Sequence, residues 1–204
     1  MADDEDWLAA GVRALERGQC EEAVYNLARA LSPEPNSAPA HYYLAIALRY
    51  LQRFSEALDH VDRALEIAPL TAVSWAEKGL ILGELGREEA SLVCFDRSIT
   101  LDPEQAVPRY NKGVALNQLG RYEEAIVTFQ CVFLLPAERE LVAATHAGTA
   151  SALYGQGRLP EALASYDQAI VLDPTNVEAQ EGRARVLRKL AGGTDEHNAL
   201  ERLL

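Results

Sequence analysis

The chain has 204 residues, of which 31 are acidic and 19 basic, so its formal net charge is −12 at pH 7. This negative charge argues against nucleic acid or an anionic membrane as the main partner, because both attract basic surfaces. The three cysteines are too few for a disulfide framework and indicate a reducing compartment. Because the start is acidic and no uncharged stretch is long and apolar enough to span a membrane, we expect a cytoplasmic protein.

Three columns of residues recur along the chain with a period near 34. One column holds prolines with spacings of 34, 34, 33 and 38, at Pro35, Pro69, Pro103, Pro136 and Pro174. A second holds small residues, at Gly11, Ala45, Gly79, Gly113, Ala150 and Ala184, and a third holds Ala23, Ala57, Ser91, Ala125 and Ala162. A fixed period of this length is typical of a stacked helical repeat.

Each repeat is expected to contain two helices and no strand, because period-2 alternation is absent. A glycine often follows the first helix, as at Gly18 and Gly86, where a left-handed residue costs little. Carboxylates open the second helix and favour its start, because they complement the helix dipole. The second helix ends at the proline column, since proline cannot continue a helix.

These columns resemble the tetratricopeptide repeat (TPR) family. The residues that carry the resemblance include Trp7, Gly11, Ala23, Leu27, Ala30 and Pro35 in the first repeat and Trp75, Gly79, Leu82, Gly86, Ser91, Phe95, Ser98 and Pro103 in the third. The most typical run extends from Tyr110 to Ala125. The resemblance implies an all-α, right-handed α-α superhelix, a stand-alone array of prokaryotic type.

We expect a single domain over residues 4–190, with repeats at 4–37, 38–71, 72–105, 106–142 and 143–176 and a capping helix at 177–190. The fourth repeat has three extra residues near Ala137 to Leu141, which predict an altered turn or a longer following helix. The tail at 191–204 is interpreted as either a short docked helix or a frayed end.

Helix geometry indicates where a ligand could bind. At 100° per residue, repeat positions 2, 5, 9, 12 and 13 of each first helix lie opposite the face that packs on the second helix. In the resembled family the first helices line a concave surface that binds peptides. The candidate peptide-binding residues on or near this face are Tyr42, Tyr43, Tyr50, Glu77, Tyr110, Asn111, Asn117, Gln118 and Tyr154. The apolar position-9 column, which holds Val12, Ile46, Leu80 and Val114, either lines this surface or seals the stack.

Enzymatic and metal-binding interpretations find little support. We expect no catalytic residue, no metal site and no cofactor, because no motif for them is present. The cysteines are interpreted as small buried residues. His41 and His146 stand at position 4, where Trp7 and Trp75 stand in other repeats, so they are expected to replace a core aromatic residue. Some TPR relatives bind chaperone C-terminal tails through a cationic clamp, but here only Asn111 matches it, so we expect no such binding.

The sequence therefore predicts a non-enzymatic module that binds a protein or peptide partner in its concave groove. The alternative is a structural scaffold that assembles through its convex surface or tail. A monomer is favoured, although attraction between the acidic Asp3–Asp6 and the basic Arg183, Arg185, Arg188 and Lys189 could also join molecules head to tail. Dipole compensation and solubility at the two ends of the stack are the favoured explanation of the same charges.

Overall fold

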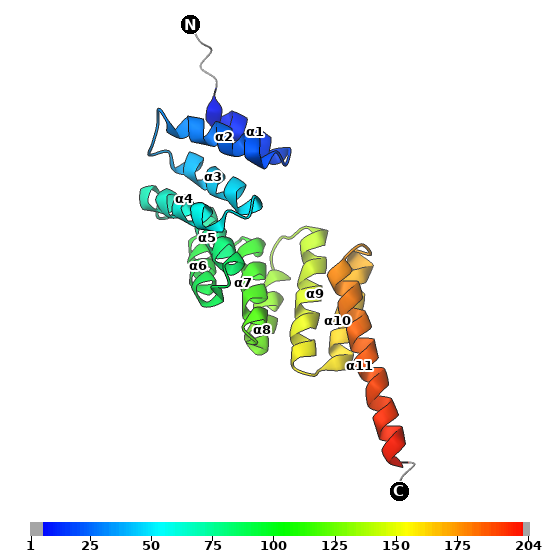
Figure 1. The fold of residues 1–204 in the computed structure, drawn as a ribbon. Coiled ribbons are helices and arrows are strands. Elements are labelled where there is room, and N and C mark those ends of the chain that lie inside the picture. Colours follow the sequence, from blue (N-terminus) through cyan, green and yellow to red (C-terminus); the bar gives the residue numbers. More distant parts are fainter. Residues whose placement is uncertain (1–5, 202–204) are drawn as a thin grey trace. The chain divides into compact units, whose positions relative to one another are not determined.

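The structure is a computed structural model that describes residues 6–201, with side chains described through residue 192. Across residues 6–201 the chain forms eleven helices and no strand, which confirms the all-α prediction (Figure 1). Contacts divide the chain into two compact units, unit 1 over Met1–Pro103 and unit 2 over Glu104–Leu204. The single domain over residues 4–190 stays a prediction.

Unit 1 contains the first three helical hairpins. Its helices are α1 (Trp7–Glu16), α2 (Cys20–Leu31), α3 (Ala38–Tyr50), α4 (Phe54–Ile67), α5 (Ala72–Glu84) and α6 (Glu88–Leu101). Helices pack in the pairs α1 with α2, α3 with α4 and α5 with α6. Within unit 1, α2 contacts α3 and α4 contacts α5, so the three pairs are stacked in order. These pairs follow the predicted repeats.

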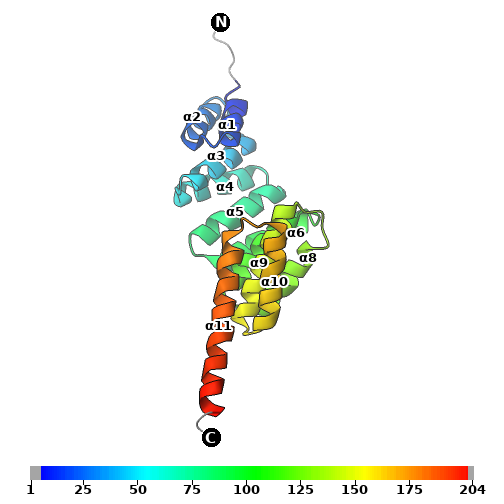
Figure 2. The same cartoon turned by 90° about the vertical axis from the view of Figure 1, so that its right-hand side faces the viewer.

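Unit 2 contains α7 (Ala106–Gln118), α8 (Tyr122–Val132), α9 (Arg139–Gly155), α10 (Leu159–Leu172) and α11 (Val177–Glu201). Helices α9, α10 and α11 lie side by side in both views (Figures 1 and 2). The extra residues of the fourth repeat lengthen α9 to 17 residues, against 13 in α7, which confirms a longer following helix. The expected capping helix does not end at residue 190, because α11 continues to Glu201.

The turns inside the hairpins use a left-handed residue, as expected. Gly18, Gly86, Gly120 and Gly157 have φ between 67° and 76°, and Gln52 has φ 59° at the equivalent turn of the second hairpin. In the first turn the Gln19 amide donates to the Ala14 carbonyl at 2.9 Å, which satisfies a carbonyl at the end of α1. Each hairpin is thereby closed by a short and well-defined turn.

The core depends on large side chains of second helices that fit against glycines of first helices. A Cβ atom on Gly79 of α5 would lie 2.6 Å from Phe95 of α6, closer than real contacts allow. In unit 2 the Phe129 ring lies between two first helices, because a Cβ on Gly113 or on Gly148 would approach it to 2.5 or 2.6 Å. The small-residue column is therefore a steric requirement.

Side chains at repeat position 4 tie successive hairpins together. The Trp75 Nε1 donates to the Pro69 carbonyl at 2.9 Å, and the Gln180 Nε2 donates to the Pro174 carbonyl at 2.6 Å. The His41 Nε2 lies 3.0 Å from the Pro35 carbonyl in the same arrangement, and His41 is buried. As predicted, His41 replaces a core aromatic residue, and it also anchors the loop that precedes its helix.

His41 meets a second histidine from α4. Its Nδ1 lies 2.9 Å from the Nδ1 of His60, and the two rings are 5.2 Å apart. When His41 is neutral, its Nε2 donates to the carbonyl, so its Nδ1 accepts and the His60 Nδ1 donates. Burial, followed by the charge of His41, lowers the pKa of His60, although Asp59 and Glu56 act in the opposite direction. The structure therefore favours a neutral His60.

Substitution at Gly79 tests the steric requirement. We expect Gly79→Ala to lower the free energy of unfolding by about 1–2 kcal/mol, because overpacking against Phe95 outweighs the gain in helix propensity. Gly83→Ala in the same helix is the control, since a Cβ there meets no atom within 4 Å. It should raise the free energy of unfolding by roughly 0.5–1 kcal/mol. Urea unfolding measures the free energy of unfolding of both variants. A change of this free energy in the same direction in the two variants would contradict the steric account.

The histidine pair predicts acid sensitivity. Because the folded-state pKa of His60 is lowered, its stabilising effect is complete above the unfolded pKa of about 6.5 and declines as the pH falls below that value. Thermal melts between about pH 7.5 and 5.5 should show a smaller acid-induced loss in His60→Gln than in the unmodified protein. Equal acid-induced losses of thermal stability in the two proteins would show that His60 is not their cause.

Candidate functional site

The candidate residues form two groups, one in each unit. Helices α3 and α5 of unit 1 carry Tyr42, Tyr43, Tyr50 and Glu77, and helices α7 and α9 of unit 2 carry Tyr110, Asn111, Asn117, Gln118 and Tyr154. All of these helices are first helices of their hairpins. The candidate site therefore consists of two surfaces, each within its own unit.

In unit 1 an ion pair joins the two first helices. The Arg49 Nε of α3 donates to the Glu77 Oε1 of α5 at 2.6 Å, and the Glu77 residue is only 5% exposed. The sequence predicts that Glu77 faces a ligand, but its carboxylate is buried and holds Arg49. Sequence reasoning missed Arg49, which stands at repeat position 12, as Asn117 and Tyr154 do in their repeats.

The tyrosines beside this pair differ in exposure. The Tyr50 residue is 61% exposed, and its ring lies 4.7 Å from the Arg49 guanidinium. Tyr42 is half-buried and meets Tyr43 edge to face, with ring centroids 5.1 Å apart. Burial, together with the negative charge of Glu77, raises the pKa of Tyr42 to about 12. Tyr42 therefore contributes mainly to packing, whereas the Tyr50 ring is exposed and is held in place by the ion pair.

In unit 2 the candidates divide in the same way. Tyr110 is half-buried against Phe129, with ring centroids 6.0 Å apart, and burial raises its pKa. The Asn117 Nδ2 donates to the Gly148 carbonyl of α9 at 2.8 Å, while its Oδ1 is buried and receives no hydrogen bond from the described residues. Gln118 is exposed, and Asn111 and Tyr154 are partly exposed. Gln118 and Tyr154 are the accessible polar and aromatic groups of this surface.

The residues of the position-9 column are intermediate in burial. Each of its apolar members is partly exposed, namely Val12, Ile46, Leu80 and Val114. Full burial would have assigned them to the interior of the stack alone. Partial exposure makes them apolar surface between the more exposed side chains.

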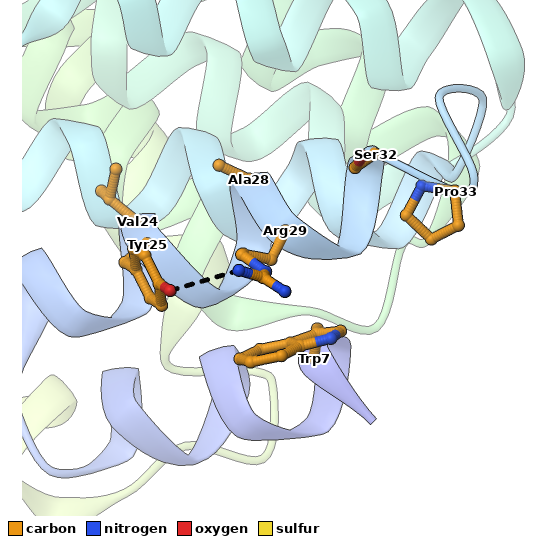
Figure 3. A pocket seen from close by; sticks show the side chains of 7 residues that line it. All are labelled: Trp7, Val24, Tyr25, Ala28, Arg29, Ser32 and Pro33. Carbon is orange, nitrogen blue, oxygen red and sulfur yellow. Dashed lines mark hydrogen bonds between the residues drawn. The ribbon is translucent and has the colours of Figure 1, made fainter. Parts of the chain in front are cut away.

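A hollow between the two helices of the first hairpin is not predicted by the repeat pattern. It measures about 520 Å³ and is lined by Trp7, Val24, Tyr25, Ala28, Arg29, Ser32 and Pro33 (Figure 3). The Arg29 guanidinium lies 4.5 Å from the Trp7 ring, and Arg29 donates a hydrogen bond of 3.4 Å to the Tyr25 hydroxyl. Figure 3 shows these three side chains grouped between α1 and α2. Tyr25 is 58% exposed, so an aromatic surface is accessible here too.

The described residues offer little other chemistry. No group of three or more His, Cys, Asp or Glu side chains among them could hold a metal ion. Cys94 is buried, and burial raises its thiol pKa, but Cys131 is exposed, which corrects the expectation that the cysteines are buried. Cys131 stands at the end of α8, next to the irregular link to α9. No described helix is long and apolar enough to cross a membrane.

Comparison with protein families identifies the repeat. Models described as tetratricopeptide repeat match residues 38–70, 72–105 and 94–127, and a model described as TPR repeat matches residues 150–190. The chain belongs to the tetratricopeptide repeat family. The TPR fold is a protein–protein interaction module. A search of curated proteins finds no match.

Solved structures with the same fold include YrrB, described as a TPR protein with an unusual peptide-binding site. The TM-score is 0.70 at 19% identity, covering 89% of this chain and 92% of YrrB. The thermophilic TPR protein TTC0263 of Thermus thermophilus gives 0.71 at 22% identity, covering 90% and 98%. A chain of the APC/C hetero-tetramer Cut9–Hcn1 gives 0.80 at 19% identity, covering 91% of this chain and 36% of that one. At these identities the likeness concerns the fold alone.

The ion pair of unit 1 predicts an asymmetric mutational response. Arg49→Met leaves the buried Glu77 carboxylate without its partner, so the free energy of unfolding should fall by roughly 3 kcal/mol. The double variant Arg49→Met with Glu77→Leu should be clearly more stable than the single variant, because no buried charge remains. Denaturant unfolding of both variants measures this difference, and additive losses would show that the pair is not coupled.

Proposed function

We propose that the protein is a non-enzymatic, cytoplasmic interaction module that binds a peptide segment of a partner protein on the inner face of its first helices. A monomer is the expected binding form. The partner contributes an extended segment, and the helical hairpins contribute a rigid surface. An exposed aromatic ring, the polar groups of unit 2 and the relatives support this role.

The observation that carries the proposal is the position of Tyr50. A ring that is 61% exposed on a first helix contributes little to the core, yet it lies on a guanidinium that a buried carboxylate fixes. Tyrosine offers a broad apolar face and a hydroxyl at low entropy cost, which suits recognition. A ring held in advance also loses less freedom on binding.

Polar groups of unit 2 support the same role. Gln118 is exposed, and Asn111 is partly exposed. Such amides can bond to the backbone of an extended peptide regardless of its side chains. The YrrB description as a peptide-binding TPR protein is consistent with this use of the fold. Because Asn111 has no cationic clamp partners in the equivalent positions, we propose no chaperone-tail binding.

A second candidate is a scaffold that assembles through its outer surface. The hollow around Trp7, Tyr25 and Arg29 favours it, since this aromatic group between α1 and α2 includes the exposed Tyr25 of a second helix (Figure 3). This candidate and the inner-face proposal use different tyrosines. The two can therefore be separated by mutation.

The test uses peptides selected on the immobilised protein from a random display library. Tyr50→Ala should weaken the selected peptides by about tenfold, the loss expected when an aromatic anchor is removed. Tyr25→Ala is the matched control, because Tyr25 is exposed to a similar degree but lies on a second helix. It should change the affinity by less than about twofold. Fluorescence anisotropy measures the affinities, and circular dichroism confirms that both variants are folded.

The reverse outcome would be equally informative. If Tyr25→Ala abolishes binding and Tyr50→Ala does not, the outer surface is the binding surface and the inner-face proposal is wrong. If neither variant weakens any selected peptide, neither Tyr50 nor Tyr25 is a recognition residue.

A further inference from the structure

Three side chains of unit 2 form a basic patch, defined here as Tyr154, Arg185 and Lys189. Tyr154 belongs to α9, and the two cations belong to α11. The Lys189 Nζ lies 4.9 Å from the centre of the Tyr154 ring, and the Arg185 guanidinium lies 5.9 Å from it. Both cations are exposed, and both stand on the side of α11 that meets α9.

The cations of the basic patch have no carboxylate partner among the described side chains. Elsewhere in unit 2 such pairs are common: Arg158 pairs with Glu161, Arg121 with Glu124, and Arg183 with Asp167 on the neighbouring α10. In a chain whose acidic residues outnumber its basic ones, 31 to 19, two adjacent cations without such a partner stand out. Contact with an aromatic ring orients a cation but does not neutralise its charge.

The charge on this side of α11 also changes along the helix. Glu178 lies in its first turn, and its charge contributes, after burial, to the raised pKa values of Tyr110 and Tyr166. Arg185 and Lys189 follow two and three turns later. A ligand on this surface would therefore meet negative potential near the start of α11 and positive potential at the basic patch.

We infer that the basic patch binds the carboxylates of an acidic peptide segment, and that the Tyr154 ring holds the two cations in position for them. This inference rests on the proposed peptide-binding function and specifies the chemistry of the partner. Exposed cations pair with carboxylates. Arginine offers a planar group of several hydrogen-bond donors, whereas lysine offers a compact point charge. The gradient along α11 gives such a segment one preferred direction.

The probe is a short fluorescein-labelled peptide of alternating aspartate and glycine, compared with the same peptide carrying asparagine. Fluorescence anisotropy at about 20 mM and about 200 mM salt should show binding of the aspartate peptide only, weakened at the higher salt. Arg185→Gln with Lys189→Gln should weaken it at least about fivefold. Arg185→Lys with Lys189→Arg, which retains both charges, should bind normally.

A charge-matched control separates local contact from net charge. Arg87→Gln with Arg97→Gln removes the same two charges from unit 1, at the N-cap of α6 and within that helix, where both side chains are exposed. It should leave binding of the aspartate peptide within about twofold of the unmodified protein. Equal losses in the two double variants would overturn the inference, as would equal binding of the aspartate and asparagine peptides.

Two further outcomes would also overturn it. A molecular mass that rises with concentration at low salt, and returns to the monomer when Asp3–Asp6 are replaced by their amides, would assign the basic patch to a second copy of the chain. Residues 3–5 lie outside the described part of the structure. If the aspartate peptide fails to bind while library peptides still bind in a Tyr50-dependent manner, only this inference is wrong, and the proposed function stands.

Discussion

The fit of a large side chain on each second helix against a small residue on the first is the contact on which the rest of the structure depends. At Gly79 and Gly113 even one methyl group would collide with Phe95 or Phe129. This contact sets how closely the two helices of a hairpin approach, and it orients the first helix about its own axis. Residues on the opposite side of that helix are thereby directed away from the hairpin core.

Side chains of the candidate site in unit 1 also take part in helix packing. The Arg49–Glu77 pair joins neighbouring hairpins of unit 1, and it also holds the exposed Tyr50 ring. His41 fills a core position, anchors the Pro35 carbonyl and contacts His60. A binding surface built from such residues is rigid, because moving any one of them would also disturb the stack.

Repeat period and small-residue columns are sufficient to predict the fold, since both follow directly from helix geometry and close packing. They predict the hairpins, the left-handed turns and the longer α9. They fail where a side chain has a partner from another hairpin. The sequence does not show that the Glu77 carboxylate is buried against Arg49, because the two residues lie 28 positions apart and periodicity does not encode such a pairing. A ligand contact at Glu77 stays a prediction. The cluster of Trp7, Tyr25 and Arg29 lies within one hairpin, but it also escapes prediction, because the columns do not describe contacts between individual side chains. The predicted capping helix at 177–190 is shorter than α11, which continues past Gly192 and Gly193 to Glu201.

The central claim is that the inner faces of the first helices dock a peptide. Hydrogen exchange with mass spectrometry, on the protein alone and with a library-selected peptide, tests it most directly. We expect added protection along α3 and α5, or along α7 and α9, and unchanged exchange in α2 and α4. Protection confined to α1 and α2, around the hollow between them, would contradict the claim.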